Sequence, residues 1–170
     1  MLSALHRLRP IIGIEMSRIF KLISTALAAT IVASASASDE LPTFDQYLVH
    51  EKFSGPVAKP ILRSKQDREF RGQLQRAAHM RPNFAGHFVL TTFGCGASCV
   101  MDGALDARTG RVTWLPFTVC CGNYDDHEPL EFRPDSALLV VRGMRNETGN
   151  GTYYYVFTAG VFKLIAERPL

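Results

Sequence analysis

The spacing of hydrophobic residues divides the chain into a helical part and a strand-forming part. Ser64 can cap a helix that begins at residue 65, and Pro82 stops that helix. Four apolar residues fall on one helical face: Phe70, Leu74, Ala77 and Ala78. This pattern predicts one main helix at about 65–80. After Pro82, hydrophobic residues recur with the shorter period of β-strands.

Six segments after Pro82 are rich in β-branched, aromatic and aliphatic residues, and Gly, Asn, Asp or Pro residues separate them. They are 84–93, 99–106, 111–121, 137–142, 152–158 and 161–166. The links between them are too short for helical crossovers, so the strands are expected to pair as antiparallel hairpins. The pattern predicts an α+β fold with a single antiparallel sheet of about six strands and one main packed helix.

Residues 1–37 have the composition of an export signal. Two basic residues precede an apolar run at 22–32, and small residues follow up to Ala37. The apolar run is well short of the roughly 20 residues that cross a bilayer, so a signal peptide cleaved after Ala37 is favoured over a membrane anchor. Met16 begins a signal of ordinary length, so the true start is Met1 or Met16.

The expected organisation is a signal peptide at 1–37, an irregular N-terminal segment at 38–64, and a helix plus antiparallel β domain at 65–170. The chain has 19 Lys and Arg against 16 Asp and Glu, of which four basic residues and one acid lie in 1–37. Because the remaining charges balance, no nucleic acid partner and no anionic membrane are expected. The predicted product is periplasmic or secreted, with no membrane span after signal cleavage.

The strand register brings the cysteines together. A turn at 107–110 pairs Asp106 with Arg111, and the same register places Cys120 opposite residue 97. The glycine-rich segment from Gly94 to Cys99 is interpreted as a tight loop rather than as a strand. All four cysteines are therefore expected at one end of the sheet: Cys95, Cys99, Cys120 and Cys121.

In an oxidising compartment, four such cysteines predict two disulfides. A bridge between the neighbours Cys120 and Cys121 is the least favoured pairing, because successive strand residues point to opposite faces. Pairing of Cys95 and Cys99 with Cys120 and Cys121 is slightly preferred. The alternative interpretation is a metal-binding or thiol redox protein, in which the four thiolates and His127 would bind zinc or copper.

The sequence does not favour an enzyme. His87 is eight residues from Cys95, or about 26 Å along a strand, so it cannot activate that thiol. No serine-hydrolase elbow, phosphate-binding loop or H-E-x-x-H motif occurs. The favoured function is a binding or interaction module for a protein or glycan ligand of the cell envelope, with Gly94, Gly96, Ser98 and His87 as candidate binding residues.

Four motifs also resemble those of a known group of proteins. They are Asn83-Phe84-Ala85-Gly86-His87, Gly94-Cys95-Gly96-Ala97-Ser98-Cys99, Asp106-Ala107-Arg108-Thr109-Gly110-Arg111-Val112 and Asp135-Ser136-Ala137-Leu138-Leu139-Val140-Val141. On these motifs, most of residues 80–165 resembles a family of small uncharacterised exported bacterial proteins. The resemblance implies a secreted domain and assigns no catalytic residue.

Overall fold

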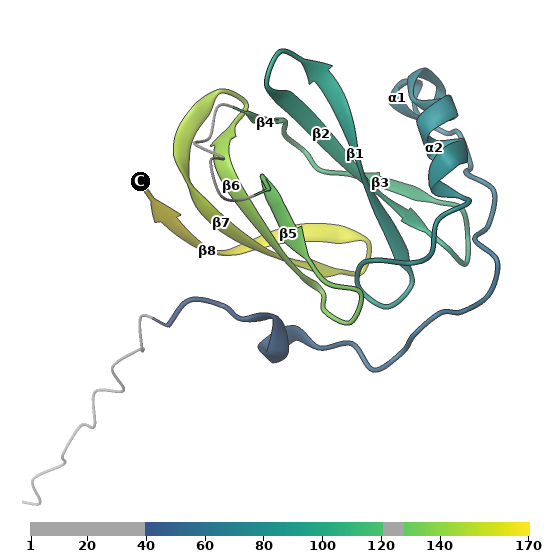
Figure 1. Ribbon diagram of the computed structural model, residues 1–170, viewed down its shortest axis with the longest axis horizontal. Coiled ribbons are helices and arrows are strands. Elements are labelled where there is room, and N and C mark those ends of the chain that lie inside the picture. Colours follow the sequence, from purple (N-terminus) through teal and green to yellow (C-terminus); the bar gives the residue numbers. More distant parts are fainter. Residues whose placement is uncertain (1–39, 121–127) are drawn as a thin grey trace, which may run out of the picture. The chain divides into compact units, whose positions relative to one another are not determined.

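The computed structural model describes residues 40–120 and 128–170 (Figure 1). Its helical elements are a 3-10 helix, η1 (Phe44–Tyr47), and two α-helices, α1 (Lys65–Glu69) and α2 (Arg71–Ala77). Its strands are β1 (Phe88–Gly96), β2 (Cys99–Asp106), β3 (Val112–Trp114), β4 (Val119–Cys120), β5 (Leu130–Phe132), β6 (Leu138–Arg145), β7 (Thr148–Thr158) and β8 (Val161–Pro169). Within these ranges, no helix is both long enough and apolar enough to cross a membrane.

The strands form a single antiparallel sheet in the order β1-β2-β4-β6-β7-β8, with β3 beside β2 and β5 beside β6. The prediction of one antiparallel sheet is confirmed, but the number of about six strands is wrong, because the described sheet has eight. The expected strand at 111–121 is interrupted between β3 and β4, where Pro116 has no backbone N–H for the ladder. The short strand β5 was not predicted.

The prediction of one main helix is also wrong, because the helical segment is broken at Phe70 (φ −95°, ψ 18°) into two short helices. The Phe70 ring contacts the rings of Phe93 and Trp114, with centroids 5.2 and 5.6 Å apart. The predicted helix start is confirmed. Ser64 Oγ accepts a hydrogen bond from Asp67 N at 2.9 Å, and Asp67 Oδ2 accepts one from Ser64 N at 2.7 Å.

The sheet bends around its main hydrophobic core. Phe88 on β1 contacts Phe157 on β7, with ring centroids 4.7 Å apart, although β2, β4 and β6 separate these strands in the sheet. Phe84, just before β1, stacks on Phe162 of β8. Leu90, Leu139 and other buried residues complete this core. Aromatic side chains from both ends of the strand order therefore meet on the inner face.

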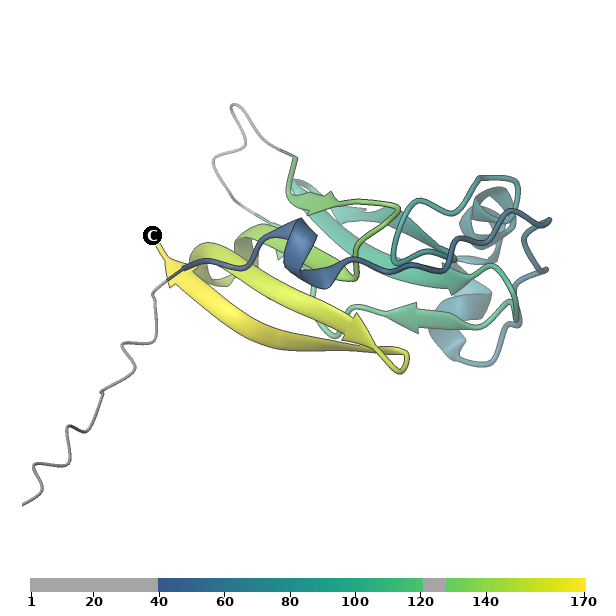
Figure 2. The same ribbon diagram turned by 90° about the horizontal axis from the view of Figure 1, so that it is seen from below.

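Two smaller clusters cover the outer face of the sheet. Ala77 of α2 packs against Val89 and Leu105, and Val57 joins them from the N-terminal segment. On β6 and β7, Leu138, Val140 and Tyr154 are covered by Phe44, Tyr47 and their neighbours. Figure 2 shows the N-terminal segment running past the strands towards the helices. The segment before the helices is thus an integral part of the packing.

Candidate functional site

One wall of the candidate site is an extended segment at residues 49–62, which we call the strap. Four backbone N–H groups of the strap donate to carbonyl oxygens far along the chain, at distances between 2.7 and 2.9 Å. The donor and acceptor residues are Val49 and Asp135, Phe53 and Gly86, Ala58 and Ala107, and Ile61 and Gly110. These bonds fix the strap along the sheet, although it forms no regular strand of its own.

Two glycines allow the strap to approach so closely. Gly86 has φ +80° and Gly110 has φ +74°, a region that L side chains rarely adopt. A Cβ atom at Gly86 would overlap the carbonyl oxygen of Glu51, and one at Gly110 would overlap that of Lys59. Glu51 also pairs with Arg108. Glycine is therefore required at both positions for two reasons: the positive φ of the turn, and the close approach of the strap carbonyl.

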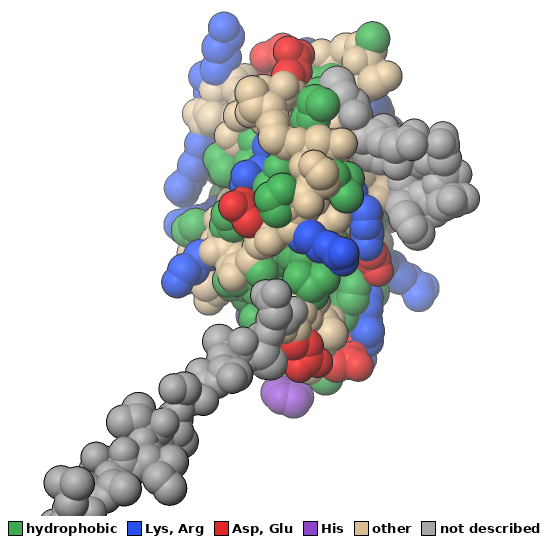
Figure 3. All heavy atoms as spheres, turned by 90° about the vertical axis from the view of Figure 1, so that its left-hand side faces the viewer, with side chains coloured by type: hydrophobic (Ala, Val, Ile, Leu, Met, Phe, Trp, Pro, Cys, Tyr) green, Lys and Arg blue, Asp and Glu red, His purple; other side chains and the backbone are tan. Residues whose placement is uncertain are grey.

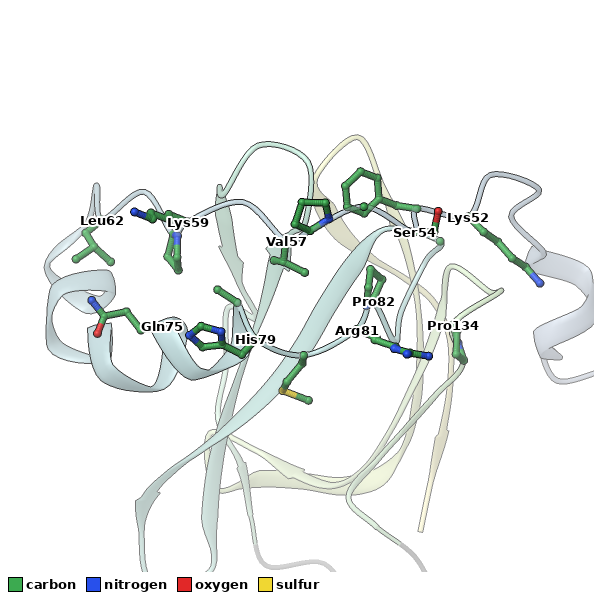
Figure 4. Close-up of a pocket in the computed structure, with 17 residues that line it drawn as sticks. Lys52, Ser54, Val57, Lys59, Leu62, Gln75, His79, Arg81, Pro82 and Pro134 are labelled. Carbon is green, nitrogen blue, oxygen red and sulfur yellow. The ribbon is translucent and has the colours of Figure 1, made fainter.

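Between its anchored positions the strap leaves a groove with a volume of about 1160 Å³. The opposite wall consists of the last turn of α2 and the connection at 78–82 (Figure 4). Val57, Ala78 and Pro82 contribute apolar surface between the walls. A groove of this size, with apolar surface and a few polar groups, is typical of a ligand site.

The groove is cationic. Lys52, Lys59 and Arg81 line it together with His79, and none of the described lining residues is a carboxylate. Within residues 40–120 and 128–170, none of the three cations forms an ion pair within 4.0 Å. The face seen in Figure 3 lacks this excess of one charge, since acidic, basic and hydrophobic side chains are mixed there. The excess of positive charge can therefore attract an anion, although Lys52 also interacts at longer range with the Asp135 carboxylate, which pairs with Arg133.

The cysteine hairpin, residues 94–99 with the adjoining ends of β1 and β2, lies away from the groove lining. The expected register of β2 with β3 is confirmed, because Leu105 pairs with Val112 and Gly103 with Trp114. Cys120, however, lies opposite Cys99 and not opposite residue 97. The register shifts by two positions because residues 115–118 leave the ladder between β3 and β4.

The predicted clustering of cysteines at one end is confirmed for the three that the structure describes. The slightly preferred disulfide pairing is wrong, because Cys95 is bonded to Cys99, with Cα atoms 5.2 Å apart. Strand β1 continues to Gly96, and a bulge at Cys95 brings that residue next to its partner across the turn. Cys120 is buried, and Cys121 lies outside the described residues, so the second disulfide stays a prediction.

The predicted metal site is not assembled among the described residues, which contain no group of three or more potential ligands. Two of the proposed ligands, Cys95 and Cys99, are joined in the disulfide and offer no thiolate. Cys121 and His127 lie outside the described residues. Zinc or copper binding, and thiol redox chemistry, remain predictions for a reduced form of the protein.

The structure separates the four candidate binding residues into two places. Gly94, Gly96 and Ser98 lie exposed at the tip of the cysteine hairpin, and among the described residues no atom beyond the chain neighbours lies within 4 Å of the positions that a Cβ would take at the two glycines. His87 lies at the opposite end of β1, where its carbonyl accepts a hydrogen bond from Ala107 N. Burial, and then the Arg108 guanidinium, lower the pKa of the His87 imidazole. These four residues therefore form no common site.

A buried carboxylate lies between these two places. Asp102 on β2 has no exposed surface and accepts a hydrogen bond from Thr92 on β1. Its second oxygen, Oδ2, has no hydrogen-bond partner among the described residues. Burial raises the pKa of Asp102 to about 6. This side chain makes the hairpin region sensitive to pH.

The groove residues were missed because each one is ordinary in the sequence. One signal was present: from Lys52 to Lys65 the chain carries four basic residues and no acid. Pro56 and Pro60 interrupt any regular element in that stretch. A proline-containing segment whose charges are all positive is compatible with one wall of a binding site. No pattern in the nearby sequence identifies residues 78–82 as the opposite wall.

The chain was also compared with known proteins. It matches no protein-family model, no curated protein and no solved structure. The resemblance to exported bacterial proteins therefore stays an expectation based on the motifs, and the site has to be interpreted from its own geometry.

Proposed function

We propose that the protein is an exported, disulfide-stabilised binding module of the cell envelope, and that its groove binds an anionic ligand. The observation that carries the proposal is the charge of the groove. Lys52, Lys59 and Arg81 line it, no described carboxylate accompanies them on the lining, and none has an ion-pair partner there. Charge of one sign in a concave site favours ligands of the opposite charge.

The way in which the strap is held supports a binding role. Its backbone bonds to Gly86, Ala107, Gly110 and Asp135 fix one wall of the groove before any ligand arrives. A preformed wall lowers the conformational entropy that binding has to overcome. The groove also has apolar surface at Val57 and Pro82, against which the uncharged part of a ligand can pack.

The proposal is tested with poly-L-glutamate as the probe and the purified full chain, by fluorescence anisotropy at two salt concentrations. The double variant Lys52→Glu/Lys59→Glu is expected to weaken binding more than about tenfold, because it reverses two of the groove charges. The matched control is Lys163→Glu/Arg168→Glu, which makes the same change of charge on exposed residues of β8.

If the two double variants weaken binding equally, the probe responds to net charge and the groove is not its site. If the unchanged protein fails to bind poly-L-glutamate at low salt, a uniformly charged polyanion is excluded as the ligand of the groove. Urea unfolding of each variant shows whether a loss of binding comes from a loss of folded protein.

The compartment and the metal alternative are tested on protein recovered from a bacterial periplasm. Intact mass is measured before and after reduction, together with metal content. Two disulfides give a mass lower by about 4 Da than the reduced chain, whereas free thiols with stoichiometric zinc or copper would support the metal alternative. Protein that stays in the cytoplasm with residues 1–37 attached would contradict export.

A further inference from the structure

The cations of the groove lie at two separate ends. In Figure 4, Lys59 and His79 lie in one half of the groove and Lys52 and Arg81 in the other, with Val57 between the halves; Pro82 lies beside Arg81, and the Lys52 side chain extends away from Arg81. Each end combines a residue of the strap with one from the opposite wall. A ligand that uses both ends needs two anionic groups with an uncharged part between them.

The length of chain between Lys52 and Lys59 sets an upper limit to the distance between the two ends. Lys52 and Lys59 are seven positions apart on the strap, so their Cα atoms are at most about 24 Å apart. Two carboxylates on a small metabolite lie only a few ångströms apart and would fall short of a span near this limit. An extended peptide rises about 3.3 Å per residue, so roughly five to seven residues cover the span when the long lysine side chains reach inward.

The middle of the groove favours a peptide over a polyanionic glycan. Val57, Ala78 and Pro82 offer aliphatic contacts to an apolar side chain. Phe53 is the one phenyl ring among the described lining residues, and it lies over Gly55, where a Cβ would be 2.8 Å from it. Phe53 is therefore a restricted platform for a sugar ring. A chain that carries charge on every unit would also place anions against the aliphatic middle.

The strap can add backbone hydrogen bonds to such a peptide. Its N–H groups at Phe53 and Ala58 donate to the turn carbonyls of Gly86 and Ala107, whereas the N–H groups of Ser54, Gly55 and Val57 make no backbone hydrogen bond within the described residues, and Pro56 has no N–H. Ser54 is exposed among them. An extended peptide lying beside this stretch can pair with these groups in the manner of an added strand.

We propose that the groove binds an extended acidic peptide segment, with two acidic side chains about six residues apart and apolar residues between them. One acidic side chain lies between Lys59 and His79, and the other between Lys52 and Arg81. The inference rests on the proposed function, since it names the anionic ligand of the same groove.

The test uses two fluorescent peptides of identical composition with blocked ends. In the first, Glu-Ala-Val-Pro-Val-Ala-Glu, the acids are at the ends; in the second, Ala-Val-Glu-Pro-Glu-Val-Ala, they lie near the centre. The full chain is expected to bind the first about tenfold more tightly, because only the first reaches both cationic ends. Lys59→Gln and Lys52→Gln should each weaken the first peptide about three- to fivefold, whereas Lys163→Gln should not.

A charge swap then assigns each end. Lys59→Glu is expected to bind a peptide with one terminal Glu replaced by Lys better than it binds the original, whereas the unchanged protein shows the reverse order. Equal binding of the two Glu peptides would overturn the proposed spacing of the acids. If the groove variants still weaken the binding of poly-L-glutamate, the proposal that the groove binds an anionic ligand would stand. Binding of a sulfated oligosaccharide in preference to both peptides would overturn the peptide class. Failure of poly-L-glutamate and of both Glu peptides to bind would remove both proposals.

Discussion

The cysteine hairpin and the groove are built in opposite ways. The hairpin is closed by a disulfide between residues four positions apart, and its tip is small, uncharged and exposed. The groove depends on backbone bonds between the strap and partners as distant as Asp135, and three cations line it. One region is held by a local covalent bond and the other by many weak contacts across the fold.

The comparison shows that covalent reinforcement and candidate function occupy different parts of the molecule. A five-residue disulfide loop stabilises a fold by about 2 kcal/mol on the chain-entropy model. The strap has no such bond and relies on Gly86 and Gly110 for its close contacts. Changes at the glycines should therefore damage the groove, whereas changes at the cysteines should leave its ligand binding intact.

The largest effect is expected from Gly86→Ala. The new Cβ would overlap the carbonyl oxygen of Glu51, and the residue would keep a φ of +80°. Strain and displacement of the strap should lower the free energy of unfolding by more than about 3 kcal/mol, measured in urea, and weaken anion binding. Gly94→Ala is the matched control, because in the part of the chain that the structure describes no atom beyond the neighbours of Gly94 lies within 4 Å of its Cβ position. A Gly86→Ala protein as stable as the control would show that the strap is loosely held.

The next effect concerns pH and the hairpin region. The ordinary pKa of an Asp carboxyl is 3.8, and burial raises that of Asp102 to about 6. The folded protein thus binds this proton more tightly than the unfolded chain does. The contribution is fully present below pH 3.8 and is lost as pH rises through about 6, a change of about 3 kcal/mol in the free energy of unfolding.

Asp102→Asn removes the titrating group, so the unfolding free energy of this variant should vary less between about pH 3 and pH 8 than that of the unchanged protein, by about 3 kcal/mol. Urea unfolding across this range measures the difference. Glu69→Gln, at an exposed position on α1, controls for the loss of a carboxylate elsewhere. Parallel pH profiles for the Asp102→Asn variant and the unchanged protein would contradict the elevated pKa.

The disulfide itself gives a smaller effect. The Cys95→Ser/Cys99→Ser variant should lose about 2 kcal/mol of unfolding free energy, because the five-residue loop is no longer closed in the unfolded chain. Its affinity for poly-L-glutamate should stay within about twofold of the original, since the hairpin contributes no residue to the groove lining. A large loss of affinity in a fully folded variant would mean that the two regions are coupled.

The smallest expected effect tests a contact between the helices and the sheet. Trp114 Nε1 donates to Asp67 Oδ1 at 2.8 Å, and Asp67 is buried. Trp114→Phe should keep much of the ring contact with Phe70 and Phe93 and cost about 1.5 kcal/mol for the lost bond to a carboxylate. Circular dichroism in urea measures this change, because the variant removes the only tryptophan.

The local parts of the fold could be predicted from the sequence. The Ser64 and Asp67 cap, the turn between Asp106 and Arg111, and the β2 bounds of Cys99–Asp106 all follow from residues within a few positions of one another. Pro116, which splits one expected strand, also acts locally and was open to recognition. Strand β5 has three residues with an exposed Glu131 in the middle, too short for an alternating pattern to show.

The candidate site could not be predicted in the same way. Gly86 and Gly110 resemble ordinary turn glycines in the sequence, and only the structure shows that each makes room for the strap. The disulfide pairing likewise depends on a one-residue bulge at Cys95, which no composition rule specifies. Features that depend on contact between distant segments need the three-dimensional arrangement.

The anchoring of the strap has a consequence for the order of events during synthesis. A ribosome releases the amino end first, so residues 49–62 emerge well before Asp135, the last of their backbone partners. Until then the strap lacks the last of its anchors, although Val57 can already pack against Ala77, Val89 and Leu105, which precede residue 135. A chain interrupted before residue 134 would therefore contain every cation of the groove but lack Pro134 from its lining and Asp135 from the anchors of the strap.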